Sequence, residues 1–371
     1  MNISKAGSYG RLIAFFLVAV IVLCAFGFAV EGWQVQDTGT TPGNYDNGIA
    51  NGNTNPPSDE NAQNAQPSEQ QKPTPPQYTD SLTGLEIGAQ DTALKHLCFA
   101  LDSNAPLYGL SAVKMMIEIP IENDKTRYLV FVSPSATIGK IGSLSPTRAY
   151  ISNLAKSFNS VLISLGVDDK TAYPSADLGG MHFDISKNSG YSYSEYSKYH
   201  YSNGELINAG LTNTGISTLK TAPSQMPYAF ADFYAEEVKG NMPAQSVTLP
   251  YSTQTQLSYS STNKTYVLSK NGSTKLDTLS DAPIEFKNVF VLFADSVTYE
   301  DESGSEMVMN TTGSGKGVYM TNATAKNITW ISDAAGNLSF FDENGQALVV
   351  NRGTSYIGFV KSAKLSEVKF S

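Results

Sequence analysis

The sequence predicts a chain of mixed class: one N-terminal transmembrane helix, an α+β first domain of mixed α/β pattern, and an all-β second domain of meander or sandwich type. Three observations predict this organisation. An uncharged apolar run is followed by a polar segment, and the strand and helix patterns after it give way to closely spaced strands. The predicted segments are a cytoplasmic tail (1–11), a transmembrane helix (12–30), a disordered polar linker (31–80), a mixed α/β domain (81–223), a connector (224–244) and an all-β domain (245–371).

The apolar run at residues 12–30 contains neither a charged residue nor a proline. As a helix rising about 1.5 Å per residue it would be about 28 Å long, close to the roughly 30 Å apolar thickness of a bilayer. Lys5 and Arg11 precede the run, and the positive side of a single span stays in the cytoplasm. The pattern predicts a single-pass protein of the cell membrane whose C-terminal body is extracellular.

Two other fates of this run stay open. A signal peptide has an apolar core of about 7–15 residues, shorter than this one, although Gly27-Phe28-Ala29 would serve as a poor cleavage site. Lipidation of Cys24 would need a small residue before the cysteine, and Leu23 stands there. An uncleaved anchor is the preferred interpretation.

Residues 34–80 are rich in Asn, Gln, Pro, Gly, Thr and Ser and hold almost no apolar side chains. Such a segment cannot bury enough surface to offset its chain entropy, so we expect it to be disordered. As a flexible coil it would span roughly 40 Å. Its expected role is to hold the body away from the membrane.

The charge and the cysteines exclude several classes of protein. The net charge is -9 and the pI is about 4.9, so nucleic acid is not an expected partner, because a phosphate backbone requires clustered Lys and Arg. The two cysteines, Cys24 and Cys98, lie in the apolar run and in the body and cannot plausibly pair. The chain is therefore not a disulfide scaffold.

In the first domain, short apolar runs alternate with helical spacing. Tyr150, Ile151, Leu154 and Phe158 recur at helical spacing after Pro146, a residue that is tolerated at a helix start. A second helix is predicted at 205–211. Strands are predicted at 97–101, 115–121, 128–132 and 161–167.

In the second domain, strand patterns follow one another at short intervals. Asn271-Gly272 and Asn344-Gly345 each separate two strand-like runs, which is the strongest short-range signal of a hairpin. Residues 289–293 form a continuous apolar run suited to a central strand. Further strands are predicted at 318–321, 328–331, 338–341, 347–350 and 356–360.

An ordered set of short motifs runs through the body. It comprises Ser81-Leu82-Thr83-Gly84-Leu85, Thr126-Arg127-Tyr128, the segment 141–150, Asn288-Val289, Gly313-Ser314-Gly315-Lys316, Trp330, Asp342-Glu343-Asn344-Gly345 and Arg352-Gly353-Thr354. In order and spacing the set resembles the YerB-like lipoprotein family, which carries a domain of unknown function, number 3048, in two parts. The resemblance implies a bacterial envelope protein with a mixed first domain and an all-β second one, and it implies no reaction. The sequence departs from the family at Ser145, where the family has arginine, and at Cys24, where the lipidation motif is not met.

Two arginines of the first domain are candidate ligand-binding residues. Arg127 begins a predicted strand, and Arg148 opens a predicted helix whose N-terminal N–H groups could also face an anion. A planar guanidinium suits a carboxylate or a phosphate, so we expect both to line one anion-binding cleft together with Tyr150. The alternative is that each arginine pairs with a nearby acid such as Glu118 or Glu122.

Five tyrosines lie between residues 191 and 201, and His200 lies among them. Tyrosine combines an apolar face with a polar tip, which suits stacking on sugars or gripping a peptide. Tyr199, His200 and Tyr201 are therefore also predicted as ligand-binding residues. The alternative is a loop or hairpin that lies over the core.

Catalytic residues are not predicted. No H-E-x-x-H or C-x-x-C motif occurs, so neither a metal site nor a cofactor is expected, and His182 near Asp184 is only a weak candidate for catalysis. The leading hypothesis is an envelope protein that binds a cell-wall component or another envelope protein. The competing hypothesis is an enzyme that processes an envelope glycan or anionic polymer, with Arg127 and Arg148 positioning the substrate.

Overall fold

The computed structural model describes residues 74–168, 178, 180–221, 226–301, 304–333 and 336–371. The predicted tail and transmembrane helix and nearly all of the predicted linker lie outside the described residues. Within the described part of the chain, no helix is both long and apolar enough to cross a membrane. Strands outnumber helices throughout the described residues, which agrees with the all-β pattern predicted for the second half; the first half, predicted as mixed α/β, also consists mainly of strands.

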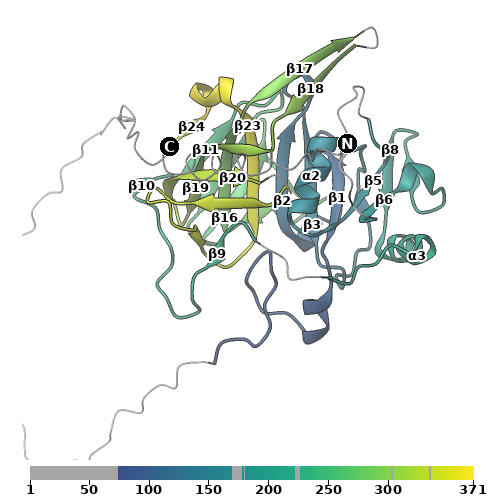
Figure 1. The fold of residues 1–371 in the computed structure, drawn as a ribbon, viewed down its shortest axis with the longest axis horizontal. Helices are drawn as coiled ribbons and strands as arrows, with labels where there is room; N and C mark the ends of the chain where they lie inside the picture. The colour runs from purple at the N-terminus through teal and green to yellow at the C-terminus, as the bar shows by residue number, and fades with distance from the viewer. Residues whose placement is uncertain (1–73, 169–177, 179, 222–225, 302–303, 334–335) are drawn as a thin grey trace, which may run out of the picture. The chain divides into compact units, whose positions relative to one another are not determined.

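Strands from both halves of the body join one eleven-stranded sheet. The first half contributes β1 (Leu97–Asp102), β2 (Val113–Pro120), β3 (Thr126–Val132), β5 (Val161–Ser164) and β6 (His182–Asp184). The second half and the segment before it contribute β10 (Met242–Pro243), β16 (Asn288–Ala294), β19 (Gly313–Thr321), β20 (Thr324–Ser332), β21 (Leu338–Phe341) and β23 (Ser355–Lys361). The order is β10-β20-β19-β16-β23-β2-β3-β1-β5-β6, and β21 pairs with β20 (Figure 1).

The two halves meet at the parallel pair of β2 and β23. Met115 lies opposite Ser355, and Glu118 lies opposite Gly358. β2 is also antiparallel to β3, and β23 is also parallel to β16. These strands are buried almost throughout because the sheet is covered on both faces, which explains why they read as continuous apolar runs rather than as alternating patterns.

A second sheet of six strands covers one face of the central sheet. Its strands are β11 (Ser246–Leu249), β12 (Thr255–Ser260), β13 (Thr265–Lys270), β14 (Ser273–Thr274), β15 (Glu285–Phe286) and β24 (Lys369–Phe370). Val247, Leu257 and Leu268 point inward and form one core with residues of the central sheet such as Val291. The predicted Asn271-Gly272 hairpin is confirmed: it joins β13 to β14, with φ of 47° and 78° at its two central residues.

The other face of the central sheet is covered by α2 (Ala149–Ser157) together with segments of the second half (Figure 1). Ile151 and Leu154 of α2 share a core with Phe131 and Trp330. The second helix, α3 (Gly204–Thr214), begins where the Asn203 side chain accepts a hydrogen bond from Leu206 N. Both helices lie where the sequence predicts them.

Three small sheets complete the body. They are β4 (Ile141–Gly142), β8 (Tyr199–Ser202) and β7 (Tyr193–Glu195); the hairpin of β17 (Ser296–Asp301) and β18 (Gly304–Met309); and the pair of β22 (Val349–Val350) and β9 (Ala229–Phe230). The hairpin of β17 and β18 projects from the body in Figure 1. Short 3₁₀ turns are η1 (Ala89–Ala93), η2 (Leu110–Ala112), η3 (Glu122–Asp124), η4 (Ile185–Lys187) and η5 (Ser362–Glu367).

Candidate binding site

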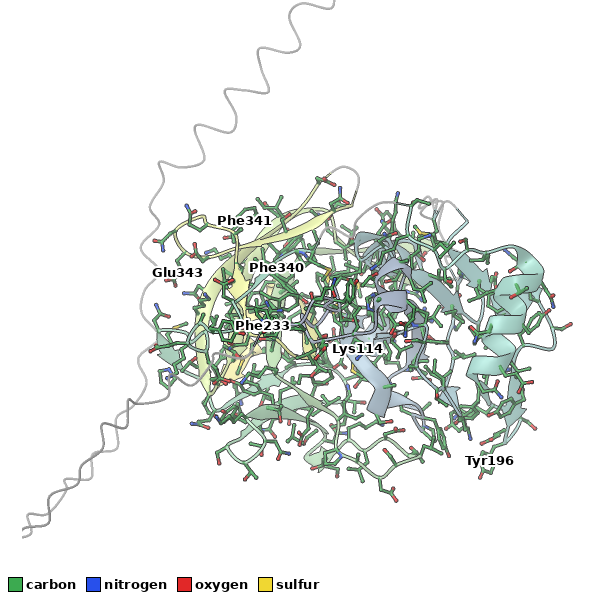
Figure 2. The ribbon with its side chains drawn as sticks, turned by 90° about the horizontal axis from the view of Figure 1, so that it is seen from below. Lys114, Tyr196, Phe233, Phe340, Phe341 and Glu343 are labelled. Carbon is green, nitrogen blue, oxygen red and sulfur yellow. The ribbon has the colours of Figure 1, made fainter. Side chains whose placement is uncertain are left out.

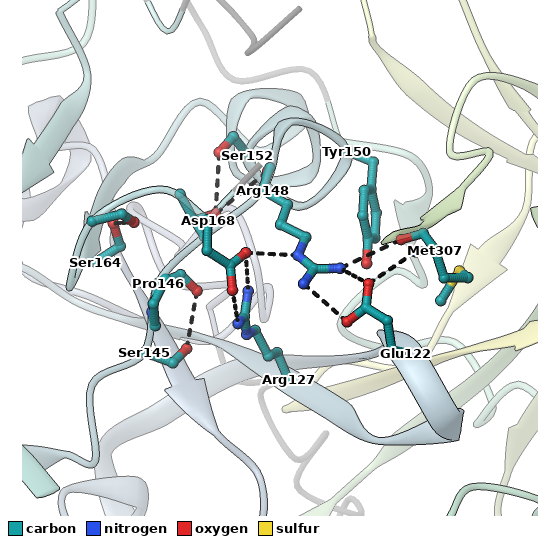
Figure 3. Close-up of polar contacts among 12 residues, drawn as sticks. Glu122, Arg127, Ser145, Pro146, Arg148, Tyr150, Ser152, Ser164, Asp168 and Met307 are labelled. Carbon is teal, nitrogen blue, oxygen red and sulfur yellow. Dashed lines mark hydrogen bonds and ion pairs between the residues drawn. The ribbon is translucent and has the colours of Figure 1, made fainter. Parts of the chain in front are cut away.

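The two predicted arginines converge on one carboxylate, that of Asp168 (Figure 3). Arg127 donates from Nη2 to Oδ2 at 2.6 Å and from Nη1 to Oδ1 at 3.3 Å. Arg148 donates from Nε to Oδ1 at 2.7 Å. Burial of Asp168 would raise its pKa, but the two guanidinium groups outweigh burial and hold that pKa below the usual range. The two arginines therefore meet at a carboxylate of the protein itself.

Arg148 is saturated by a second acid. Its Nη1 and Nη2 both donate to the Glu122 carboxylate, the latter at 2.9 Å, and Glu122 Oε1 also accepts the Met307 N–H at 2.8 Å. The Arg148 side chain is 3% exposed, so it ties the start of α2 to the β2–β3 turn and to β18. Arg148 is therefore a structural tie to Glu122, which is the alternative that the sequence left open.

Tyr150 lies next to this network but belongs to the core. Its hydroxyl donates to Pro120 O at 2.9 Å, and the residue is 1% exposed. The ring of Tyr150 packs into the core on this face of the sheet, so Tyr150 does not line the pocket beside Arg127 described below.

A pocket of about 630 Å³ opens beside Arg127, and we call it the Arg127 pocket. Its charged and ring-nitrogen residues are Asp102, Lys125, Arg127, Lys198 and His200. Its uncharged polar residues are Asn104, Thr126, Ser143, Ser145, Ser252 and Thr253. Its apolar residues are Ile121, Leu144, Pro146, Leu165 and Tyr199. Three predicted site residues, Arg127, Tyr199 and His200, thus line one pocket, whereas Arg148, Tyr150 and Tyr201 do not.

Both halves of the body build the Arg127 pocket. Asp102 ends β1 directly opposite Arg127 on β3, so the register of these two strands brings both residues to the pocket. Lys198 and Tyr199 come from the hairpin of β7 and β8, and Ser252 comes from the loop between β11 and β12. The site is therefore formed only when the second half packs on the first.

The Arg127 pocket carries an excess of positive charge, with three cationic side chains against one carboxylate. Lys125 and Lys198 are exposed and form no ion pair with any carboxylate of the described residues. Arg127 shares its charge with Asp168, so the two lysines carry most of the free positive charge. A cationic pocket in a chain of net charge -9 favours an anionic ligand.

The tyrosine-rich segment forms the hairpin of β7 and β8, which is the alternative that the sequence left open. Residues of this hairpin also line the pocket. Tyr201 is 1% exposed and packs edge-on against Tyr108, with 5.2 Å between the ring centroids. Lys140 Nζ lies 4.1 Å from the centroid of the Tyr201 ring and donates to Glu195 at 2.8 Å. Tyr201 therefore supports the hairpin from below, while Tyr199 faces the pocket and Tyr196 stands 87% exposed at the tip.

Glu118, which the sequence considers as an arginine partner, instead pairs with Lys270 of the second half. Glu118 is fully buried, and its carboxylate also accepts hydrogen bonds from Thr126 Oγ1 and Tyr356 OH, each at 2.6 Å. Thr255 Oγ1 donates at 3.0 Å. This satisfied network joins β2 and β23 to the second sheet below the Arg127 pocket, whose lining includes Thr126.

His182 and Asp184 lie on β6, but they do not pair with each other. His182 Nε2 is 2.8 Å from Ser164 Oγ, and Asp184 Oδ1 accepts from Ser186 N at 3.0 Å. Burial lowers the pKa of His182. Within the described ranges, no three His, Cys, Asp or Glu side chains gather closely enough to hold a metal ion.

The sequence did not identify Lys125, Lys198, Asp102 or Asp168 as site residues. Lys125 and Lys198 look like ordinary surface lysines along the chain. Asp168 follows a strand without any motif around it, and only the packing of β5 beside β1 brings it to Arg127. One signal in the sequence could have indicated Asp102: if the strand that ends at Asp102 pairs with the strand that begins at Thr126, Asp102 lies opposite Arg127.

Comparisons with known proteins agree with the motif resemblance. Residues 100–217 match the N-terminal domain, and residues 247–357 the C-terminal domain, of the protein of unknown function DUF3048. The crystal structure of the YerB protein from Bacillus subtilis is similar at 18% identity, covering 80% of this chain and 100% of that chain with a TM-score of 0.67. No curated protein matches the chain. The two family matches together cover more than half of the 371 residues, so the chain belongs to the DUF3048 family and has the fold of YerB.

Proposed function

We propose that this protein is a binding protein of the bacterial cell envelope and that the Arg127 pocket takes an anionic glycan outside the cytoplasm. The observation that carries the proposal is that two lysines, Lys125 and Lys198, line a polar pocket of an acidic chain without an ion pair to any described carboxylate. Free cations at a concave site attract anions and raise their local concentration.

The uncharged lining suits a sugar better than a simple ion. Ser143, Ser145, Ser252 and Thr253 offer hydroxyl groups that can both donate and accept, as sugar hydroxyls require. Tyr199 adds an aromatic side chain for the apolar face of a ring. The volume of about 630 Å³ falls within the range of about 300–1,000 Å³ that small-molecule sites occupy.

Binding is favoured over catalysis by the arrangement of acids. Asp102 is the one carboxylate among the lining residues that the structure describes, and its Oδ1 accepts the Asn104 N–H at 2.9 Å. Most glycosidases use a pair of carboxyl groups that flank the scissile bond. Asp168 is engaged by both arginines and does not line the pocket.

The envelope location is proposed from the sequence. The apolar run at residues 12–30 follows Lys5 and Arg11, and the polar segment after it separates the run from the body. A body outside the membrane on such a segment would meet wall polymers first.

The test compares the full-length protein in detergent micelles with Lys125→Ala plus Lys198→Ala. Oligogalacturonates serve as anionic probes and cello-oligosaccharides as neutral ones, and the dissociation constants are measured by calorimetry. Removal of both lysines should weaken the binding of the anionic probe about tenfold, since each exposed charge contact contributes up to about 1 kcal/mol. Rising salt should weaken the wild type more than the variant.

The control removes two exposed lysines that do not line the pocket, by Lys239→Ala plus Lys369→Ala, and so changes the net charge equally. The control should bind like the wild type. Equal losses in both variants would show that net charge, and not the pocket, governs binding. Absence of anion binding by the wild type would refute the proposed function.

A second candidate function is an enzyme that processes a glycan or an anionic polymer. It is favoured by one observation: Asp102 and His200 line the same pocket and could supply an acid and a base. New reducing ends released from the polymer by the wild type, and lost in Asp102→Asn, would establish it. If the wild type binds the polymer but releases no reducing ends, the enzyme is excluded and the binding function is retained.

A further inference from the structure

The tip of the hairpin formed by β7 and β8 holds a residue that does not suit its turn. Tyr196 and Ser197 both have a φ of 54°, and the Lys198 N–H donates to Glu195 O at 3.2 Å. Two successive positive φ values are the mark of a type I′ turn, for which Asn-Gly is the preferred pair. An aromatic residue with positive φ is uncommon, because its Cβ crowds the backbone.

Other turns of this protein use tolerant residues in the same conformation. The first of two successive positive-φ positions is Asn123 in one turn, Asn271 in a second and Asn322 in a third. Asparagine adopts this conformation readily, so these turns follow the expected chemistry. The tip at Tyr196 departs from the pattern of these three turns.

Packing does not account for Tyr196 either. Its side chain is 87% exposed and points outward at the edge of the body (Figure 2). The other tyrosines of the hairpin have partners or a cavity: Tyr193 and Tyr201 lie 6.3 Å apart by ring centroids, and Tyr199 lines the Arg127 pocket. Tyr196 thus adopts a backbone conformation that disfavours an aromatic residue and buries little of its side chain.

The hairpin that carries Tyr196 is continuous with the Arg127 pocket and is held firmly. Lys198, Tyr199 and His200 directly follow the turn and line the pocket. The hairpin is fixed at its base by strand pairing of β8 with β4, and next to its turn by the Lys140 ion pair to Glu195. The tip therefore presents its aromatic ring on a rigid support beside the pocket, which lowers the entropy lost on binding.

We propose that Tyr196 is an outer stacking subsite for the same ligand, so that the ligand is an anionic glycan polymer longer than the pocket. The glycan leaves the Arg127 pocket past Lys198, and one of its sugar rings stacks on the face of Tyr196. This inference rests on the proposed function and extends it from a sugar-sized ligand to a polymer. A tyrosine face is apolar and its hydroxyl polar, which suits a pyranose ring in water.

The test replaces the tip with the pair that the turn prefers, by Tyr196→Asn plus Ser197→Gly. The melting temperature should stay the same or rise by about 1–3 °C, because the new pair fits the backbone and the base of the hairpin is untouched. The full-length variant should bind a galacturonate disaccharide like the wild type. It should bind the octasaccharide about five- to tenfold more weakly than the wild type does.

Two controls separate stacking from other effects. Tyr196→Trp keeps an aromatic face and should retain the tight binding of the octasaccharide. Tyr299→Asn removes another exposed tyrosine, on β17, that does not line the pocket, and should change nothing. A loss of octasaccharide binding in Tyr299→Asn equal to that of the turn variant would overturn the subsite.

The remaining outcomes distinguish the two proposals. If the wild type binds neither oligomer, the proposed function fails and the subsite fails with it. If the wild type binds both oligomers equally, or if the turn variant keeps the full affinity for the octasaccharide, the proposed subsite is wrong. Binding of an anionic glycan in the Arg127 pocket is then still supported. A lowered melting temperature would contradict the premise that Tyr196 strains the turn.

Discussion

At the scale of single residues, the two arginines show how similar side chains acquire different roles. Arg148 meets the carboxylates of both Glu122 and Asp168, and its side chain is 3% exposed. Burial alone would lower the pKa of Arg148, but the two acids outweigh burial and raise it. Arg127 meets one carboxylate and also lines a pocket. Arg127 is therefore the arginine that a ligand can reach, and Arg148 is structural.

Asp80, at the start of the Ser81-Leu82-Thr83-Gly84-Leu85 motif, has a similar structural role. Its Oδ2 lies 2.9 Å from His96 Nε2, and its Oδ1 accepts the N–H groups of Leu82 and Thr83, each at 2.9 Å. Burial would raise the pKa of Asp80, but His96 and the N–H groups outweigh burial and lower it to about 2. These contacts hold the motif as a closed loop next to the first residue of β1, which directly follows His96.

This depressed pKa predicts a pH-dependent contribution to stability. Because the folded pKa lies below the unfolded value, the contribution of roughly 2 kcal/mol is complete above pH 4 and is lost as the pH falls from about 4 to about 2. Asp80→Asn removes the charge, so the difference in free energy of unfolding between wild type and variant should shrink over that range. Urea unfolding at pH 6, 4 and 3 measures it. A difference that stays constant with pH would contradict the assignment.

At the scale of elements, the contact between the central sheet and the second sheet centres on a buried ion pair. Glu118 on β2 and Lys270 on β13 are separated by 152 residues along the chain, and Glu118 is fully buried. Two charges without exposure to water stay favourable only when their remaining hydrogen bonds are satisfied, as Thr126, Thr255 and Tyr356 satisfy those of Glu118. The pair therefore links β2 of the central sheet to β13 of the second sheet through a satisfied network.

Removal of one partner should reveal this dependence. Lys270→Met leaves the Glu118 carboxylate buried and uncompensated, and it should lower the free energy of unfolding by about 3–5 kcal/mol. Adding Glu118→Gln should restore part of that loss, because a neutral amide needs no cation. Urea unfolding of the two single variants and the double variant gives the coupling between the sites. Additive losses would show that the two side chains do not act as a pair.

At the scale of the whole molecule, the two family halves share one sheet. β2 and β23 pair in parallel although they lie at opposite ends of the described chain, and the Arg127 pocket takes residues from both halves. The described residues of the body, from residue 74 onward, belong to one compact unit. The division that the family models make along the sequence is therefore bridged by strand pairing in space.

Separate halves should consequently fail to fold. Residues 71–223 alone would expose the β2 edge and leave Glu118 without Lys270, and residues 245–371 alone would expose the edge of β23. We expect neither fragment to give a cooperative thermal transition in circular dichroism, and we expect the mixture of the two to regain one. A fragment with a sharp transition of its own would show that its half folds independently.

The sequence by itself determined the strand-rich second half, the helices at 149–157 and 204–214, the Asn271-Gly272 hairpin and the family, because local periodicity reports which faces meet water and turn chemistry is local. It also identified Arg127, Tyr199 and His200, which line one pocket. It predicted Arg148, Tyr150 and Tyr201 as site residues as well, although these three do not line that pocket. Only the tertiary structure decided that Asp168 joins both arginines, that Glu118 pairs with Lys270, and that Lys125 and Lys198 meet at the pocket. The reason is physical: a strand's pattern shows that it is buried but not which strand lies beside it, and every one of these contacts depends on that choice.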